Sequence, residues 1–433
     1  SRSKASLGKR TGDNSPFSRA VGGDSRYNVK GLAPSAFAQV GCKVRVSLLA
    51  GEVASGGGKL PRLGREMGPQ AALVALDART GEVVALVGGQ GFERGGFDRA
   101  IRGLRQPGSA FKPFVYLAAI RSRLFTAATI IDDAPVSYDE YRPENYETWK
   151  FMGPIRLRPA LAQSVNVVAI RLIEKVGAAE VASLAASMGI ASKLDPVLGL
   201  ALGSSGVRPI EITAAYATLA AGGIRMEHAM VRRIVDPWGH DIDLPEMAAP
   251  ARVVEEPEAW ILTGMLRSVV EDADGTGKLA RKLGRAAAGK TGTSDKARDA
   301  WFVGWTTTLV AGVWSGFDDM KPIGPKEAGG KTAVPVWTAF MKEALRGTPE
   351  ADFPGPPPGV TSASIDPASG LLAWEGQPDA VIEWFLDGTE PRESAIPPGV
   401  QTPEGYLMED GFEDPAPAEA PGAEGLRPPD PPP

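Results

Sequence analysis

Cysteine and histidine are almost absent from this sequence of 433 residues. Cys42 is the single cysteine, which excludes an internal disulfide and a zinc site of the CxxC type. The two histidines, His228 and His240, are isolated, so we expect them in surface loops rather than in a metal site or a Ser–His pair. A nucleophile in this chain would need a base other than histidine.

Long apolar runs are also missing. No stretch of 18 apolar residues occurs, so the sequence predicts no membrane-spanning helix, and it shows no signal peptide. The chain begins with Ser1 rather than methionine, and we therefore expect it to be part of a longer protein.

The overall composition is that of a globular protein, with 43% hydrophobic and 23% charged residues. The net charge of −5 argues against general nucleic-acid binding, but the charge is uneven. Residues 1–68 carry twelve basic against four acidic side chains, and residues 350–433 carry two against seventeen. The basic stretch is either a surface for anionic lipid head groups or a solvated linker.

Pattern changes divide the chain into five parts. They are a linker or disordered segment (1–35), a small β module (36–67), a main domain (68–348), a small C-terminal β appendage (349–400) and a disordered tail rich in proline and acidic residues (401–433). In the β module, alternation over residues 40–48 predicts a strand, and Gly56-Gly57-Gly58 predicts a turn after it.

The main domain begins with strand patterns, continues with helical ones and ends with strands. Strands are expected at 71–76, 82–87, 300–306 and 309–315, and helices at 167–176, 179–188, 209–221, 257–270 and 335–345. This order predicts an α/β fold of the α+β type, with one mainly antiparallel sheet flanked by helices. In the appendage, residues 360–365 and 371–374 flank a turn and are expected to be strands.

The segment Gln106-Pro107-Gly108-Ser109-Ala110-Phe111-Lys112-Pro113 carries the first candidate chemistry. Pro-Gly ends the preceding element and an apolar run follows, so Ser109 is predicted near a helix N-terminus with Lys112 on the same face. A desolvated lysine can take the proton of a serine nucleophile. The alternative is a helix start without catalytic function, in which the lysine is solvated. Ser-x-x-Lys also occurs at Ser1 and Ser6, so the pattern alone is weak evidence.

Two further motifs lie in the main domain. Ser164-Val165-Asn166 separates two apolar helical stretches, and Lys290-Thr291-Gly292-Thr293 fits a strand whose glycine allows a close backbone approach. The near-copy Lys331-Thr332-Ala333 shows that Lys-Thr-Gly alone is a modest signal, whose alternative reading is a strand end with a glycine bulge.

Taken in order, Ser-x-x-Lys, Ser-x-Asn and Lys-Thr-Gly form the signature of penicillin-binding proteins and serine β-lactamases. With the flanks Gly88-Gly89, Arg105–Pro113, Gly289–Thr293 and Asp299–Gly304, residues 40–389 resemble the transpeptidase domain of a class A (bifunctional) penicillin-binding protein. The resemblance implies that 68–348 is the transpeptidase domain and that 36–67 is part of an OB-like module.

The resemblance also implies roles for particular residues. It assigns Ser109 as nucleophile, Lys112 as proton acceptor and Ser164 as proton relay. Lys290, Thr291 and Thr293 would bind the terminal carboxylate of the donor peptide, and Asn166 its amide. The backbone N–H groups of Ser109 and Thr293 would form the oxyanion hole. The candidate residues are therefore catalytic Ser109, Lys112, Ser164 and Lys290, and substrate-binding Asn166, Thr291, Gly292 and Thr293, with no metal and no cofactor.

The implied function is a D,D-transpeptidase that cross-links peptidoglycan stem peptides on the periplasmic side of the cell membrane and is inhibited by β-lactams. Class A β-lactamases add a deacylating glutamate, whereas Leu198–Ser205 contains no carboxylate. The membrane helix and glycosyltransferase domain of class A proteins are not found in this chain, so membrane contact is expected only through a missing N-terminal segment. The alternatives are a D,D-carboxypeptidase, a β-lactam sensor that is acylated once, and a non-catalytic scaffold.

Overall fold

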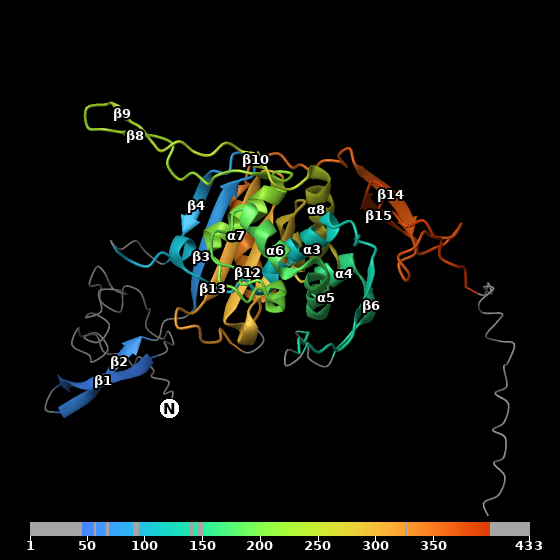
Figure 1. Ribbon diagram of the computed structural model, residues 1–433. Helices are drawn as coiled ribbons and strands as arrows, with labels where there is room; N and C mark the ends of the chain where they lie inside the picture. Colours follow the sequence, from blue (N-terminus) through green and yellow to red (C-terminus); the bar gives the residue numbers. More distant parts are fainter. Residues whose placement is uncertain are drawn as a thin grey trace, which may run out of the picture.

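The computed structural model describes residues 46–55, 58–65, 69–89, 95–138, 142–145, 150–324 and 327–398 (Figure 1). Of the sequence predictions, the linker, the first part of the β module and the acidic tail lie outside these residues. The described part of the β module is an antiparallel pair of β1 (Val46–Ser55) and β2 (Gly58–Arg65), and Gly56 and Gly57 of the predicted turn lie outside the described residues.

The central element is a five-stranded antiparallel sheet in the order β11-β12-β13-β3-β4. Its strands come from the two ends of the main domain: β3 (Gln70–Asp77), β4 (Val83–Val87), β11 (Ala288–Thr293), β12 (Asp299–Trp305) and β13 (Leu309–Gly316). The helices come mainly from the chain between β4 and β11. The predicted α+β architecture is therefore confirmed.

Hydrophobic cores lie on both faces of the sheet, because alternate side chains of a strand point to opposite sides. On β12, Trp301 and Trp305 pack with the helical layer visible beside the sheet in Figure 1. Phe302, between them, points the other way and packs with Trp337 of α9. One face thus carries the larger helical core and the other is covered by the closing helix.

The helical elements follow the predicted pattern closely. They are α2 (Arg99–Arg102), η2 (Gly108–Phe111), α3 (Lys112–Arg121), α4 (Leu157–Ala162), α5 (Asn166–Val176), α6 (Ala178–Ser187), η3 (Leu198–Leu202), α7 (Pro209–Ala220), α8 (Glu256–Glu271), η4 (Lys278–Leu283), η5 (Asp295–Ala297) and α9 (Gly329–Ala344). Among the described residues, none of these helices combines the length and hydropathy needed to cross a membrane.

Four two-stranded antiparallel sheets complete the described architecture. They are β5 (Ile130–Asp133) with β6 (Gly153–Arg156), β7 (Ile224–Arg225) with β10 (Ala251–Arg252), β8 (Ile234–Val235) with β9 (Asp241–Ile242), and β14 (Val360–Ile365) with β15 (Val381–Leu386). The first interrupts the stretch that the sequence predicted to be mainly helical.

Two sequence predictions are wrong in detail. The closing helix begins at Gly329 rather than Pro335, which lies inside α9. Residues 371–374 are not a strand, because Leu372 makes only isolated bridges and β14 pairs with β15 instead. The run at β15, Val-Ile-Glu-Trp-Phe-Leu, is richer in β-branched and aromatic residues and forms the longer ladder.

Candidate active site

The predicted nucleophile, Ser109, lies on the 3₁₀ turn η2, directly before α3. Gly108 precedes it with φ +57°, and a Cβ there would lie 2.3 Å from the Thr293 carbonyl oxygen of β11. Only glycine fits this backbone conformation and this close approach. On the other side, the Tyr216 hydroxyl of α7 donates to the Ala110 carbonyl at 2.6 Å. The serine turn is therefore held between edge strand β11 and helix α7.

Lys112, one turn further along, is completely buried. Its Nζ donates to the backbone carbonyl of Ser164, to Ser164 Oγ at 3.2 Å and to Asn166 Oδ1 at 2.7 Å. The carbonyl and amide oxygens are pure acceptors and can take both hydrogens of a neutral amine. The lone pair of that neutral amine then remains for a hydroxyl proton.

Burial lowers the pKa of Lys112 well below its usual value. The nearby cation Lys290 lowers the pKa further, whereas the carboxylate of Asp133 raises it. Lys290 is also completely buried, and burial lowers its pKa to about 7. Because a charged amine is costly in a dry interior, the site favours a neutral lysine near neutral pH.

Ser164 connects α4 to α5 and has φ +63°, a conformation that few residues other than glycine adopt. This backbone turns both its hydroxyl and its carbonyl oxygen to Lys112. Asn166 opens α5, and its Nδ2 donates to the Glu144 carbonyl at 2.8 Å, so its Oδ1 faces the lysine. The Ser-x-Asn motif thus provides every hydrogen-bond acceptor of the Lys112 amine found among the described residues.

The Lys-Thr-Gly motif forms β11. A Cβ at Gly292 would lie 2.2 Å from the Pro107 carbonyl oxygen and 2.9 Å from the Ala110 Cβ, as the predicted close approach requires. Lys290 Nζ donates to the Thr291 carbonyl at 3.2 Å. The strand therefore lies directly against the serine turn.

The two threonine hydroxyls of this strand take part in packing. Thr291 Oγ1 donates to Thr276 Oγ1 at 2.7 Å, and Thr293 Oγ1 accepts from the Gly329 backbone N–H at 3.1 Å. Sequence reasoning missed Thr276 and Gly329, because each lies outside the three motifs and meets β11 only in the folded chain.

Arg105 and Gln106, which precede the serine turn, hold it in place through contacts with other parts of the fold. Arg105 is buried, stacks over Trp314 and forms an ion pair with Asp318. Gln106 Nε2 donates to the Ser204 carbonyl at 2.9 Å, and the Trp301 indole donates to the Gln106 carbonyl at 2.8 Å. These bonds fix the segment that leads into Ser109.

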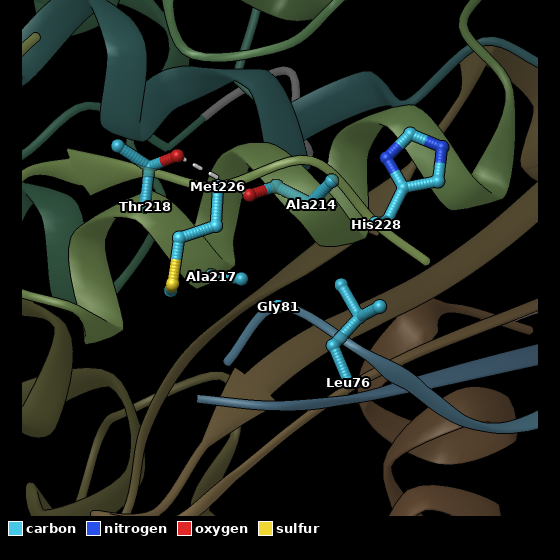
Figure 2. A pocket seen from close by; sticks show the side chains of 7 residues that line it. All are labelled: Leu76, Gly81, Ala214, Ala217, Thr218, Met226 and His228. Carbon is cyan, nitrogen blue, oxygen red and sulfur yellow. Dashed lines mark hydrogen bonds between the residues drawn. The ribbon is translucent and has the colours of Figure 1, made fainter. Parts of the chain in front are cut away.

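The histidines lie on exposed segments, as predicted. Figure 2 shows the hollow beside His228, which is lined mainly by apolar groups of β3 and α7 such as Leu76 and Ala214. Its side-chain polar groups are His228 and the Thr218 hydroxyl, which donates to the Met188 carbonyl at 3.2 Å. Within the described residues, no group of three His, Cys, Asp or Glu side chains could hold a metal ion.

Ser-x-x-Lys, Ser-x-Asn and Lys-Thr-Gly therefore come together beside one edge of the sheet, and these three motifs are those of class A β-lactamases and penicillin-binding proteins. The chain belongs to the penicillin-binding protein transpeptidase family, because the model "Penicillin binding protein transpeptidase domain" matches residues 71–342. A second model, "Penicillin-binding protein 1A, C-terminal domain", matches residues 356–395.

Similar curated proteins carry the same family name. Penicillin-binding protein 1A of Aquifex aeolicus is 38% identical over 330 residues, covering 75% of this chain and 44% of that protein. Penicillin-binding protein 1A of Pseudomonas aeruginosa is 35% identical over 388 residues, covering 76% of this chain and 47% of that protein. The chain therefore spans less than half the length of these relatives.

Solved structures agree with this assignment. The crystal structure of penicillin-binding protein 1A from Haemophilus influenzae has a TM-score of 0.70 and 28% identity, covering 88% of this chain and 60% of that one. The PonA1 protein of Mycobacterium tuberculosis in complex with penicillin V has a TM-score of 0.61 and 28% identity, covering 67% of this chain and 82% of that one.

Proposed function

We propose that this chain is a serine D,D-transpeptidase that cross-links peptidoglycan stem peptides through an acyl-enzyme on Ser109. One observation carries the proposal. The buried amine of Lys112 follows Ser109 by three residues and is bonded to Ser164 Oγ and Asn166 Oδ1. A neutral amine in that place is the base that a serine nucleophile needs.

In the proposed acylation, neutral Lys112 takes the Ser109 Oγ proton while Oγ attacks the carbonyl carbon of the penultimate D-alanine. The bond to the terminal D-alanine nitrogen then breaks. Ser164 Oγ gives that nitrogen a proton and regains one from Lys112, so the amine leaves neutral and the base is restored. Burial of Lys112 and its contact with Ser164 support this route.

Charge on the tetrahedral intermediate would be held by the backbone N–H groups of Ser109 and Thr293. Removing such a donor from another serine hydrolase costs about 3–4 kcal/mol. Lys290 and the hydroxyls of Thr291 and Thr293 would bind the donor carboxylate. The contact of Gly108 with Thr293 supports a hole between η2 and β11.

The acyl-enzyme is expected to persist until an amine attacks it. The segment 198–205 lies against the serine turn, because a Cβ at Gly203 would lie 2.4 Å from the Gly108 carbonyl oxygen. No residue of that segment is a carboxylate that could activate water. The acceptor amine would pass its proton through Ser164 and Lys112, and Ser109 Oγ would regain its hydrogen.

Further parts of the proposal concern location and inhibitors. β-Lactams mimic the acyl donor and would acylate Ser109, in line with the solved complex of PonA1 with penicillin V. We place the chain on the periplasmic side of the cell membrane, as in the cell envelope where its relatives of the penicillin-binding protein 1A type act. The proposed division into 36–67, 68–348 and 349–400 follows the sequence pattern.

Turnover of a stem peptide, with and without an added amine acceptor, tests the proposal. We expect a cross-linked product that requires the amine and is absent with Ser109→Ala. Release of D-alanine with no aminolysis product would indicate a carboxypeptidase instead. A single acylation without turnover of any peptide or thioester would indicate a sensor.

A further inference from the structure

A buried carboxylate lies behind the Ser-x-Asn motif and belongs to none of the three motifs. Asp133, the last residue of β5, has no exposed surface. Its two oxygens accept from the Asn145 side-chain Nδ2 at 2.9 and 3.0 Å, and one also accepts from the Met152 backbone N–H at 2.9 Å. Among the described residues it forms no ion pair within 4 Å.

Asn145 links Asp133 to the first turn of α5 through hydrogen bonds. Its Oδ1 accepts from the backbone N–H groups of Asn166 at 3.0 Å and Val167 at 3.4 Å. These are orphan donors of the first helical turn, and Val165 at the N-cap position has no side-chain acceptor for them. Asn145 Nδ2 is fixed by Asp133 and by the Lys150 carbonyl, to which it donates at 3.2 Å, so its oxygen must point to the helix.

The neighbouring residue holds the side chain of Asn166. The Glu144 carbonyl accepts from Asn166 Nδ2, which leaves Asn166 Oδ1 for the Lys112 amine. The Glu144 carbonyl therefore orients the Asn166 side chain, and Asn145 Oδ1 binds the Asn166 backbone N–H. Asp133 in turn orients Asn145. A chain of hydrogen bonds runs from Asp133 through Asn145 and Asn166 to Lys112.

A buried carboxylate is costly unless hydrogen bonds or opposite charge compensate it. Three N–H contacts compensate Asp133, and its remaining charge acts on the lysine. The ionisable side chains that act on Lys112 are Asp133 from β5 and Lys290 from β11, with opposite effects. Its other contacts, Ser164 and Asn166, are neutral.

We propose that Asp133 and Asn145 are positioning residues for the acylation of Ser109, which hold Asn166 and Lys112 in their working arrangement. This inference rests on the proposed function. It assigns no contact with substrate to either residue.

A polarity swap tests the inference. Asp133→Asn puts an amide donor opposite the Asn145 donor, and Asn145→Asp puts two carboxylates side by side. The double variant Asp133→Asn/Asn145→Asp restores one donor opposite one acceptor, and an aspartate still accepts the N–H groups of α5. It does not restore the longer bond from residue 145 to the Lys150 carbonyl. Asp132→Asn, on the exposed neighbour in the same strand, is the matched control.

The measurement is the second-order rate constant for acylation by a fluorescent penicillin, recorded against pH, with thermal unfolding of each variant beside it. We expect each single variant to acylate about tenfold more slowly, because a buried partner is left unpaired. The double variant should recover most of the rate, and Asp132→Asn should match wild type.

The pH profile separates positioning from plain loss of stability. Removing the Asp133 charge lowers the pKa of Lys112, so the acidic limb of the Asp133→Asn profile should move to lower pH. Two results would overturn the inference: wild-type rate and profile in Asp133→Asn, or a double variant that fails to fold or is no faster than the single variants. Wild type that takes no label would instead refute the proposed function.

Discussion

At the scale of single residues, the site depends on two glycines, because neither has a Cβ. Gly108 and Gly292 let η2 and β11 touch backbone to backbone, since a Cβ on either would lie within 2.3 Å of a carbonyl oxygen. Rigid backbone cannot yield as a side-chain tip can. The spacing between the serine and the strand is therefore set by two glycines.

Gly292→Ala should destabilise the protein by about 1–3 kcal/mol, the usual cost of overpacking, and should slow penicillin acylation. Urea unfolding and labelling of the same samples measure both effects. Gly355→Ala is the control, because a Cβ there meets nothing within 4 Å. Equal stability of the two variants would show that the strand can move away at little cost.

Lys290 should make stability depend on pH. The unfolded chain keeps its Lys290 proton up to a pH of about 10.4, whereas the pKa of the folded lysine is lowered to about 7. Between these values the unfolded state binds more protons, so the free energy of unfolding should rise with pH. Lys290→Met should remove this contribution.

The difference in unfolding free energy between wild type and Lys290→Met, measured from neutral to alkaline pH, isolates the effect. We expect the unfolding free energy of wild type to increase relative to that of Lys290→Met as pH rises. A difference that stays constant would mean that the buried lysine keeps its charge.

The motifs predicted most of the residues that meet at the site, because Ser-x-x-Lys and Lys-Thr-Gly have fixed local spacing. Asp133 and Asn145 could not be found in this way. They follow no periodic pattern, and their link to Lys112 exists only after β5 pairs with β6 and α5 begins at Asn166.

At the scale of elements, the C-terminal hairpin is joined to the segment that carries Ser164. Glu383 of β15 is almost completely buried and forms an ion pair with Arg158 at the start of α4, near Arg156. Trp384 packs edge-on against Trp260 of α8, with ring centroids 5.0 Å apart. The small β appendage is therefore packed against the helices behind the site.

Glu383→Gln should loosen this contact, because it leaves two partly buried arginines without their carboxylate. Loss of one partner of a buried ion pair costs about 3–5 kcal/mol, and partial exposure of the arginines puts this case at the lower end. Hydrogen exchange of β14 and β15 should increase. Glu375→Gln, on an exposed side chain, serves as the control, and unchanged protection in Glu383→Gln would contradict the prediction.

Helix boundaries show why element prediction was incomplete. A proline commonly opens a helix, which favoured Pro335 as the start of α9. The helix begins earlier, at Gly329, which packs against β11 and β12 with no room for a Cβ beside the Trp301 carbonyl. Gly329 contacts residues that are far from it in sequence, so no local sequence pattern predicts this helix start.

At the scale of the whole molecule, the sheet closes only when both ends of the main domain meet. β3 and β4 precede the helical region by sequence, yet β3 pairs with β13 along its whole length. This closure was predictable from the order of strand, helix and strand patterns. It makes β11, which carries Lys-Thr-Gly, the edge strand next to the η2 turn of Ser109, whereas Ser164 and Asn166 are placed by α4 and α5.

The most direct test of the account is the intact mass of the protein after exposure to penicillin, for wild type beside Ser109→Ala. We predict one covalent adduct per chain in wild type, lost only slowly in water, and none in the variant. An adduct that survives in Ser109→Ala, or a wild-type protein that hydrolyses penicillin rapidly and stays unmodified, would contradict the assignment of Ser109 as the acylated residue of a transpeptidase.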